Sequence, residues 1–397
     1  MFRKSLLFIF ITIIQNSLKA QEKPEFRGVW IATVTNIDWP ETATSGSENE
    51  KESFIKILDA HKRNGINAVI VQIRPASDAF YPSALEPWSQ WLTGTQGKPP
   101  QPWYDPLPFM IAETHKRGME FHAWINPYRA VFNIKDVTVA PTHITRIHPE
   151  WFLTYGDKKY FDPGNPEGRK YVSYIVRDIA SRYDIDAFHF DDYFYPYKIA
   201  GHEFPDNASF QKYGNGMNKN DWRRSNVDSI IYLICNTIKK INPKCQFGIS
   251  PFGIWRNSDR DPERGSLTHA GTTNYDDLYA DILLWLKSGW IDYVTPQLYW
   301  DRGSKVAPFE TLVDWWNDHC YGKNCYIGIG IYRAGSNEFW RNKNELPAQI
   351  NKIRSASNVQ GMSFYSSKVL EKNPNGWSDS LRLNYFKNPA PLPVLQK

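Results

Sequence analysis

Two adjacent aspartates, Asp191 and Asp192, follow an apolar run and are themselves followed by aromatic residues. Carboxyl groups act in enzymes as nucleophiles, general acids or general bases, and apolar surroundings shift their pKa toward those tasks. Side chains alternate along an extended run, so His189 and Asp191 share one face of residues 187–191 while two phenylalanines take the other. Asp191 is therefore the first candidate for a catalytic nucleophile or base. Asp192 is its alternative, because it lies in the turn where the alternation ends.

A second carboxyl group is needed if the chemistry is cleavage of a glycosidic bond, because the leaving oxygen must be protonated. Asp301 follows the run 293–299 and has the same parity as Gln297 and Tyr299. The aromatic residues before it would raise its pKa, as a general acid requires, so we predict Asp301 as the acid. The remaining carboxyl candidates are Asp38, Asp78 and Glu338. A structural or substrate-positioning role explains each of them more simply.

Polar side chains recur on one face of four such runs, near the C-terminal end of each. Burying so many polar groups without a use would lower stability, so we expect them to contact a ligand. Aromatic residues are dense in the segments that follow, and their rings offer flat apolar surfaces on which sugar rings stack. These features predict a carbohydrate groove whose substrate-contacting residues are Arg74, Asp78, His122, Trp124, Asn126, Tyr128, His189, Tyr193, Gln297, Tyr299 and Trp300.

His122 and His189 raise the alternative of a metal site. No HxxxH or HxxE pair supports it, so we predict neither a metal nor another cofactor. A deacetylase, which would need a metal cluster, is disfavoured for the same reason. A barrel that binds carbohydrate without cleaving it is the other alternative. Only an enzyme needs Asp191 together with a partner carboxyl group.

The elements that would position these residues repeat as a short apolar run, a loop and a helical stretch. Alternating strands and helices predict a parallel sheet, and eight such units fit a closed (β/α)8 TIM barrel, an α/β fold in a single domain. A doubly wound sheet would need a Gly-rich phosphate turn after its first strand, which residues 34–38 do not supply. The predicted strands are residues 26–34, 68–74, 120–126, 187–191, 246–251, 293–299, 326–332 and 361–365.

The helices that separate these strands end on glycine in three places, at Gly65, Gly118 and Gly289. The connections from helix to strand are short, whereas those from strand to helix are long. That asymmetry is typical of barrel enzymes, whose sites lie at the C-terminal ends of the strands. The predicted helices are residues 52–64, 106–117, 166–183, 221–241, 276–287, 309–319 and 346–355.

Residues 1–20 have the pattern of a cleaved signal peptide, with Arg3 and Lys4 before a short apolar run and Ala20 before a polar stretch. The apolar run is shorter than the roughly 20 residues that span a bilayer. We therefore expect export to the periplasm or the extracellular space, with no stable membrane anchor after cleavage. The barrel is predicted over residues 21–388, and residues 389–397 are predicted to be a loose tail.

Removing the signal peptide, which carries three basic residues and no acid, lowers the formal charge from +5 to +2. A nearly neutral chain without a long basic run is not expected to bind nucleic acid. The oligomeric state cannot be read from the sequence. In an oxidising compartment the cysteine spacing fits two disulfide pairings, Cys235–Cys245 and Cys320–Cys325, and four buried free thiols are the alternative.

Six motifs together resemble the glycosyl-hydrolase-like family 10 of exported bacterial proteins. The resemblance extends from about residue 24 to residue 387, and no single motif would carry it alone. The motifs are EFRGVWIAT (25–33), NAVIVQIRP (67–75), AWINPYR (123–129), FHFDDYFYP (188–196), ISPFG (249–253) and PQLYW (296–300).

The resemblance implies a (β/α)8 barrel that hydrolyses bacterial glycan, with the glycan strands of peptidoglycan as the associated substrate. More distantly, the chain is similar to α-amylase and α-galactosidase barrels, which have a nucleophilic aspartate at the end of strand four, where Asp191 lies. Those barrels take their acid after strand five or strand six. Strand five here ends Ser250-Pro251-Phe252-Gly253 without a glutamate, which favours Asp301.

Overall fold

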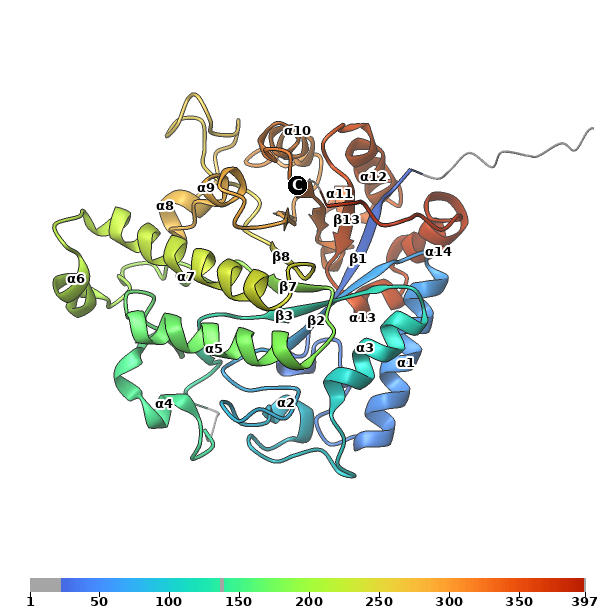
Figure 1. Cartoon of the computed structure of the whole chain (residues 1–397). Coiled ribbons are helices and arrows are strands. Elements are labelled where there is room, and N and C mark those ends of the chain that lie inside the picture. The colour runs from blue at the N-terminus through green and yellow to red at the C-terminus, as the bar shows by residue number, and fades with distance from the viewer. Residues whose placement is uncertain (1–22, 136–138, 396–397) are drawn as a thin grey trace, which may run out of the picture.

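Parallel strands lie at the centre of the molecule, in a computed structural model that describes residues 23–135 and 139–395 (Figure 1). Their pairing closes them into a ring. The ring follows the order of the sequence, and each of the eight predicted strands is confirmed within a few residues. The strands are β1 (Phe26–Ile31), β2 (Ala68–Arg74), β3 (Glu120–Ile125), β7 (Ala187–Phe190), β8 (Gln246–Ile249), β9 (Tyr293–Val294) with β10 (Gln297–Leu298), β11 (Asn324–Cys325) with β12 (Ile327–Ile329), and β13 (Gly361–Phe364).

The sixth and seventh strands of the ring are each broken into two short pieces. Pro296 separates β9 from β10, and a proline has no N–H to give to a ladder. The break does not open the barrel, because Tyr326 N donates to Val294 O and Gly328 N donates to Pro296 O, both at 2.9 Å. β12 then pairs with β13, which pairs with β1 and closes the ring.

Helices cover the outside of the ring, and the predicted ones are confirmed with shifts at their ends (Figure 1). The largest shift concerns the helix predicted over residues 276–287, which is divided into a short α8 (Asn274–Asp277) and a helix that begins only at Ile282. The covering helices are α1 (Ser47–Arg63), α3 (Pro106–Lys116), α5 (Pro166–Arg182), α7 (Lys219–Ile241), α9 (Ile282–Lys287), α10 (Phe309–His319) and α12 (Glu345–Ser355), with α13 (Ser367–Glu371) and α14 (Trp377–Ser380) after the last strand.

Local sequence explains where these helices begin and end. Asp105 and Asn165 accept backbone N–H groups at the starts of α3 and α5, and each is followed by a proline suited to the first turn. The three predicted glycine caps have positive φ angles of 76°, 63° and 67°, in the order Gly65, Gly118 and Gly289. Each therefore turns the chain directly toward the next strand.

The strands alternate as their sequences predict. In β3, Phe121, Ala123 and Ile125 join the core between sheet and helices, while Trp124 packs with Trp30 and neighbouring residues inside the barrel. A lower interior layer contains Phe26, Ala68, Ala187, Tyr293 and Tyr326. The Tyr293 ring lies where a side chain on Gly248 would be, since a Cβ there would come within 1.9 Å of it.

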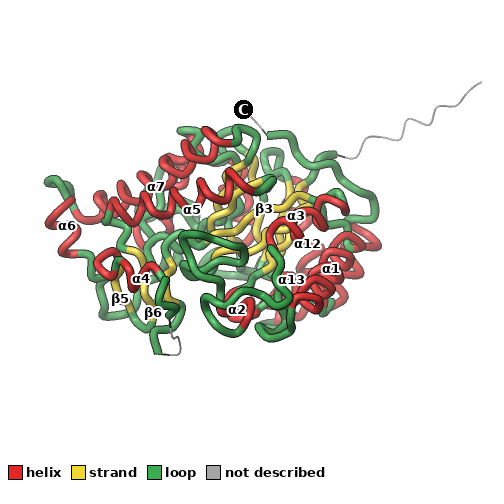
Figure 2. The backbone as a smooth tube through the Cα atoms, turned by 60° about the horizontal axis from the view of Figure 1, so that its bottom comes forward, coloured by secondary structure: helices red, strands yellow, loops and turns green. Residues whose placement is uncertain are grey.

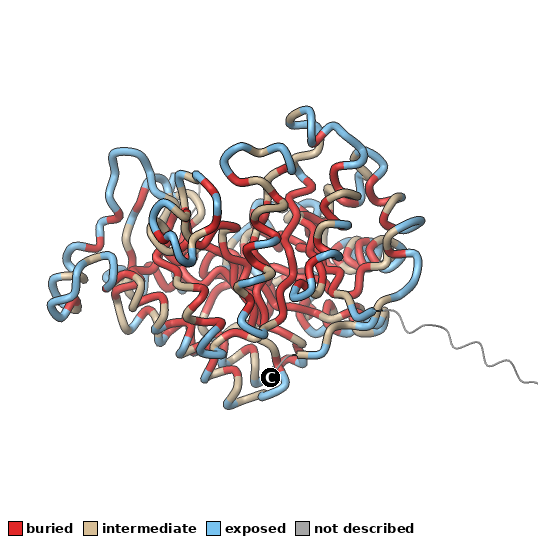
Figure 3. The backbone as a smooth tube through the Cα atoms, turned by 90° about the horizontal axis from the view of Figure 1, so that it is seen from above, coloured by how far each residue is buried: buried red, intermediate tan, exposed pale blue. Residues whose placement is uncertain are grey.

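The long loops lie at the C-terminal ends of the strands, as predicted. The loop after β3 contains a small antiparallel sheet at the edge of the molecule, beside α4 (Ile144–Ile147) (Figure 2). Buried residues concentrate in the central strands, and exposed ones in the outer loops (Figure 3). The remaining short elements are β4 (Arg129–Val131), β5 (Phe152–Tyr155), β6 (Lys158–Phe161), α2 (Gln90–Thr93), α6 (Asn207–Tyr213) and α11 (Glu338–Arg341).

The C-terminal segment is not a loose tail where the structure describes it. Pro391 O accepts the Glu25 N–H at 3.0 Å, and Ala390 O accepts the Asn67 side chain at 3.2 Å. Leu392 packs against the lower interior layer of the barrel. The segment therefore covers the N-terminal end of the ring. The prediction of a loose tail was based on its prolines and polar residues, which gave no sign of these contacts.

The predicted signal peptide lies outside the described residues. Within residues 23–135 and 139–395, no helix has both the length and the apolar character needed to cross a membrane. All four cysteines are buried free thiols in the structure, so neither disulfide pairing is formed.

Candidate active site

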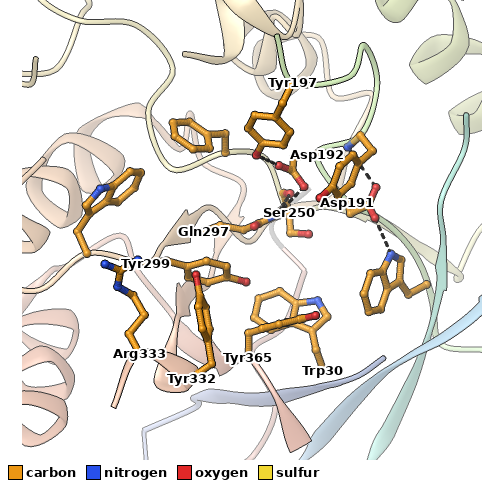
Figure 4. Close-up of a pocket in the computed structure, with 14 residues that line it drawn as sticks. Trp30, Asp191, Asp192, Tyr197, Ser250, Gln297, Tyr299, Tyr332, Arg333 and Tyr365 are labelled. Carbon is orange, nitrogen blue, oxygen red and sulfur yellow. Dashed lines mark hydrogen bonds between the residues drawn. The ribbon is translucent and has the colours of Figure 1, made fainter. Parts of the chain in front are cut away.

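A cavity of about 390 Å³ opens at the C-terminal mouth of the barrel, and Asp191 and Asp192 lie in its wall (Figure 4). Both aspartates follow directly after β7, so the barrel strand itself fixes their backbone. The other residues that line the cavity are Trp30, Trp124, Tyr193, Tyr197, Ser250, Phe252, Gln297, Tyr299, Trp300, Tyr332, Arg333 and Tyr365.

Asp191 is held by three N–H donors. Trp124 Nε1 donates to its Oδ2 at 3.1 Å, and the Asn126 amide donates to the same oxygen. The backbone N–H of Tyr193 donates to Oδ1 at 3.2 Å. Burial, and secondly the negative charge of Asp192, raise the pKa of Asp191 to about 7.

Asp192 is held by two other side-chain donors. The Tyr197 hydroxyl donates to its Oδ2, and Gln297 Nε2 donates to its Oδ1 at 3.0 Å. Burial raises the pKa of Asp192 as well, against the effect of these two donors. The two buried carboxyl groups belong to consecutive residues, and the negative charge of Asp192 disfavours the ionisation of Asp191.

A chain of hydrogen bonds runs below the cavity along the barrel axis. The Trp30 indole can only donate, so His189 Nε2 accepts from it at 3.3 Å and His189 Nδ1 donates to the Tyr293 hydroxyl at 2.9 Å. That hydroxyl donates to His122 Nδ1 at 2.8 Å, and His122 Nε2 donates to Glu120 at 2.9 Å. Burial holds the pKa of His189 well below its usual range, so it stays neutral and fixes the cavity floor.

Aromatic rings form most of the remaining wall. Phe252 and Trp300 meet edge to face with centroids 5.3 Å apart, and Tyr299 lies 6.0 Å from Tyr365. No described residue hydrogen-bonds the hydroxyls of Tyr299 and Tyr365. Such rings can stack on the apolar face of a sugar while their hydroxyls reach its polar groups.

Arg333 brings a positive charge to the same cavity (Figure 4). No carboxylate of the described residues pairs with its guanidinium, and its Nε is buried without a hydrogen-bond partner. A buried donor without a partner is costly, so the site is suited to an anionic or strongly accepting group of a ligand.

The predicted site residues divide into three groups. Seven line the cavity, namely Trp124, Asp191, Asp192, Tyr193, Gln297, Tyr299 and Trp300. Three lie behind it and orient others, namely His122, Asn126 and His189. Four lie outside the lining, namely Arg74, Asp78, Tyr128 and Asp301.

Arg74 is fully buried and paired in two places with Glu86, at 2.8 and 2.5 Å. Its Nη1 also donates to Asn126 O at 2.5 Å, so it supports the residue that holds Asp191. The register shifts between Gln72 and Arg74, and this irregularity interrupts the alternation on which the prediction depended.

Asp78 and Tyr128 are buried in the loop layer beside the barrel mouth. Asp78 accepts the Ala76 N–H and the Gln96 amide, both within its own loop region. Burial raises the pKa of Asp78 to about 7. Tyr128 is fully buried in the outer core and its hydroxyl has no described partner. Neither side chain is placed to meet a ligand in the cavity.

Asp301 is turned back toward its own loop. Its Oδ1 accepts the Gly303 N–H at 3.0 Å and its Oδ2 accepts the Asn337 amide at 2.8 Å. The strand ends at Leu298, three residues earlier, so parity along β10 does not determine its direction. We therefore assign Asp301 to holding the loop that carries Trp300 and not to proton donation.

Asp301→Ala is expected to lower the melting temperature while leaving kcat within about threefold of wild type. Each lost acceptor destabilises by about 1–3 kcal/mol, whereas no cavity carboxyl is removed. Thermal melts and steady-state rates on glycan measure the two effects, and Glu338→Ala, at an exposed position of the neighbouring α11, is the control. A loss of kcat by orders of magnitude with an unchanged melting temperature would restore Asp301 as the acid.

Seven lining residues were not predicted: Trp30, Tyr197, Ser250, Phe252, Tyr332, Arg333 and Tyr365. The inward parity of Trp30 on the first strand was available in the sequence. Tyr332 and Arg333 belong to a 3-10 turn after β12, where no periodic pattern indicates direction.

Comparisons with known proteins agree with this geometry and confirm the resemblance of the motifs. A model of the family glycosyl hydrolase-like 10 matches residues 25–345. The chain is 47% identical over 393 residues to glycosyl hydrolase YngK of Bacillus subtilis (strain 168), covering 97% of this chain and 76% of YngK. It is 40% identical over 334 residues to glycosyl hydrolase DigH of Escherichia coli (strain K12), covering 79% of this chain and 75% of DigH.

Solved structures share the fold at low sequence identity. The catalytic domain of β-amylase from Paenibacillus polymyxa superposes with a TM-score of 0.60 at 14% identity, over 93% of this chain and 99% of that one. The PgaB (BpsB) glycoside hydrolase domain from Bordetella bronchiseptica gives a TM-score of 0.54 at 13% identity, over 94% and 100%. These similarities support the barrel architecture.

Proposed function

Because this chain belongs to the glycosyl hydrolase-like 10 family and is a glycosidase, we propose that it cleaves the glycan strands of peptidoglycan at the Asp191–Asp192 cavity. The observation that carries the proposal is the pair itself. Two buried carboxyl groups with raised pKa values share one aromatic cavity at the mouth of a barrel. Perturbed carboxyl groups in such a cavity are what glycoside hydrolysis requires.

The pair supplies both proton-transfer roles. Near neutral pH one member is ionised and can act as base or nucleophile, while the other is protonated and can act as acid. We assign the base or nucleophile role to Asp191, which three N–H donors favour as an anion. Asp192 replaces Asp301 as the proton donor.

Arg333 supports a glycan that carries carboxylates. Peptidoglycan strands alternate N-acetylglucosamine with N-acetylmuramic acid, whose lactyl group ends in a carboxyl group when no peptide is attached. A guanidinium pairs with a carboxylate through two parallel hydrogen bonds. The unpaired Arg333 in the cavity wall fits such a group.

Arg333→Gln is expected to raise KM on carboxylate-bearing glycan strands by about 10- to 100-fold, the equivalent of one charge-assisted hydrogen bond of about 1.5–3 kcal/mol. KM on chitin oligosaccharides, which have no carboxylate, should change little. Steady-state kinetics on both substrates separate the effects, with Arg341→Gln at an exposed position as control. An equal rise of KM on both substrates would argue against carboxylate recognition.

Such a substrate lies outside the cytoplasm, so we propose that the chain acts after export and begins near Gln21. The signal-like pattern of residues 1–20 motivates this proposal. N-terminal sequencing of native protein from cell fractions tests it. Retention of Met1 in a cytoplasmic protein would contradict it.

Mass spectrometry of the products from purified glycan strands, with and without stem peptides, tests the proposed substrate. We expect new reducing ends and shortened strands. If another bacterial polysaccharide is cleaved, and glycan strands with and without stem peptides are not, that polysaccharide is the substrate and the proposal is wrong.

A further inference from the structure

The two carboxyl groups of the cavity come from consecutive residues. Their Cα atoms are about 3.8 Å apart, as in any trans peptide, and both side chains enter the cavity through the same part of its wall (Figure 4). A nucleophile and an acid of the usual double-displacement kind instead flank the scissile bond. One wall cannot place carboxyl groups on both sides of a sugar ring.

No third carboxyl group lines the cavity among the described residues. The nearby candidates are engaged by their own loops. Asp38 accepts the Ala32 N–H at 2.7 Å, the Ser366 hydroxyl at 2.7 Å and the Lys368 N–H at 2.8 Å. Asp301 is bound to Gly303 and Asn337 as described above. The part of the chain that the structure describes thus places no carboxylate opposite the pair in the cavity lining.

We infer that the nucleophile is supplied by the substrate, as the carbonyl oxygen of a 2-acetamido group, while Asp191 receives the amide N–H and Asp192 protonates the leaving oxygen. This inference rests on the proposed function, because it requires an N-acetylated sugar in the cavity. Participation of the substrate is a known alternative to a carboxylate nucleophile in glycoside hydrolysis.

Hydrogen-bond capacity distinguishes the two aspartates. A carboxylate has about four acceptor positions, and protein donors occupy two on Asp191 Oδ2 and one on Oδ1. One position on Asp191 therefore stays open for an amide N–H. Asp192 has one protein donor on each oxygen, which leaves room for a proton of its own. An incoming N–H at Asp191 favours the proton on Asp192.

The surroundings of Asp191 also fit an acetamido methyl group. Trp124 donates to this carboxylate and belongs to the same inner cluster as Trp30, against which Tyr365 packs. These three rings line the cavity beside Asp191. They provide an apolar floor on which a methyl group loses its contact with water.

The reaction balances without any added reagent. The amide oxygen attacks C1 and forms a C1–O bond, the glycosidic C1–O bond breaks, and its electron pair goes to the leaving oxygen, which takes the proton of Asp192. Asp191 accepts the amide N–H as the cyclic oxazoline forms. Water then attacks C1 and gives a proton to the ionised Asp192. The ring opens, the acetamido group regains its N–H, and the anomeric configuration is retained.

The test uses purified glycan strands that are de-N-acetylated and then re-acylated with acetyl, fluoroacetyl, difluoroacetyl or trifluoroacetyl groups. Each fluorine weakens the amide oxygen as a nucleophile. We expect kcat/KM to fall with each fluorine, by roughly 10²–10⁴-fold in total, which is the usual contribution of one positioned catalytic group. Lysozyme, which uses an aspartate nucleophile, is the control. Its kcat/KM on the same strands shows how far fluorine slows cleavage when the acetamido group is not the nucleophile.

If kcat/KM falls with the number of fluorines no more steeply than it does for lysozyme, while the N-acetyl strands are cleaved efficiently, the inference is overturned and the proposed function stands. Failure to cleave the N-acetyl strands at all would overturn both. A second readout is inhibition by the thiazoline of N-acetylglucosamine, which mimics the oxazoline. We expect competitive inhibition of the wild-type protein that is lost in Asp191→Ala, and no inhibition of the wild type would count against participation.

Discussion

Asp191→Asn is expected to lower kcat/KM on glycan strands by roughly 10³-fold, within the range that a positioned acid–base group contributes. Asparagine has nearly the shape of aspartate but can neither hold a charge nor receive a proton. Trp124 and Asn126 both donate to Oδ2, so an amide oxygen at that place keeps these two contacts. The cavity should therefore keep its form while the chemistry is lost.

The stability of Asp191→Asn is expected to stay close to that of wild type near neutral pH. The acceptor lost to the Tyr193 N–H destabilises the variant, while the removal of a buried charge offsets that loss. Asp184→Asn, at an exposed position before the same strand, is the matched control. A stable Asp191→Asn protein with wild-type kcat/KM would show that Asp191 is not part of the catalytic site.

The effect of Asp191→Asn on the free energy of unfolding depends on pH. The pKa of Asp191 is raised to about 7 in the folded protein, whereas an unfolded aspartate has a pKa of about 3.9. The protonated form therefore stabilises the fold below about pH 4, and this contribution is lost as the pH rises through about 7. Urea unfolding should show a decrease in stability over that interval for wild type, and a flatter dependence for Asp191→Asn.

Asp192→Asn is expected to lose activity in a way that depends on the leaving group. On natural glycan the leaving oxygen must be protonated, so the loss should be roughly 10²–10⁴-fold. A dinitrophenyl glycoside needs no protonation, so its kcat/KM, which reports the steps up to the departure of the leaving group, should fall by less than about tenfold. In wild type, kcat/KM on glycan should decrease as the pH rises and Asp192, whose pKa is raised by burial, loses its proton.

Rates on both substrates across pH test this assignment. The decrease at high pH should be present for wild type on glycan and absent for Asp192→Asn on the dinitrophenyl glycoside. Asp259→Asn, at an exposed position in the loop after β8, serves as the control. Equal losses on both substrates would assign Asp192 to substrate positioning, and the proton donor would have to be sought elsewhere.

The barrel could be predicted from the sequence because each unit is locally specified. Apolar runs are bounded by glycine caps such as Gly65 and Gly118, and helix starts are set by side-chain caps and prolines. The division of the sixth and seventh strands could not be predicted in the same way. Pro296 lies inside the single run predicted over residues 293–299, and only the hydrogen bonds of Tyr326 and Gly328 across the gap show that the ring stays closed.

The candidate site could be predicted only where strand alternation still holds. Asp191 lies one residue beyond β7, and its direction follows from that of His189. Asp301 lies three residues beyond β10, and its partners come from loops that no local pattern connects to it. Arg74 was misplaced because its partner, Glu86, lies in a long loop, where a charge pair cannot be inferred from spacing.

A crystal structure of the Asp192→Asn protein with a peptide-free glycan tetrasaccharide tests most directly where the chemistry takes place. We expect a sugar ring in the cavity, with its scissile oxygen about 2.6–3.2 Å from the side chain at position 192, as a proton donor requires. Asp191 should face the same ring. A glycan bound elsewhere on the barrel mouth, with solvent alone between Asp191 and Trp300, would contradict the assignment of this cavity as the active site.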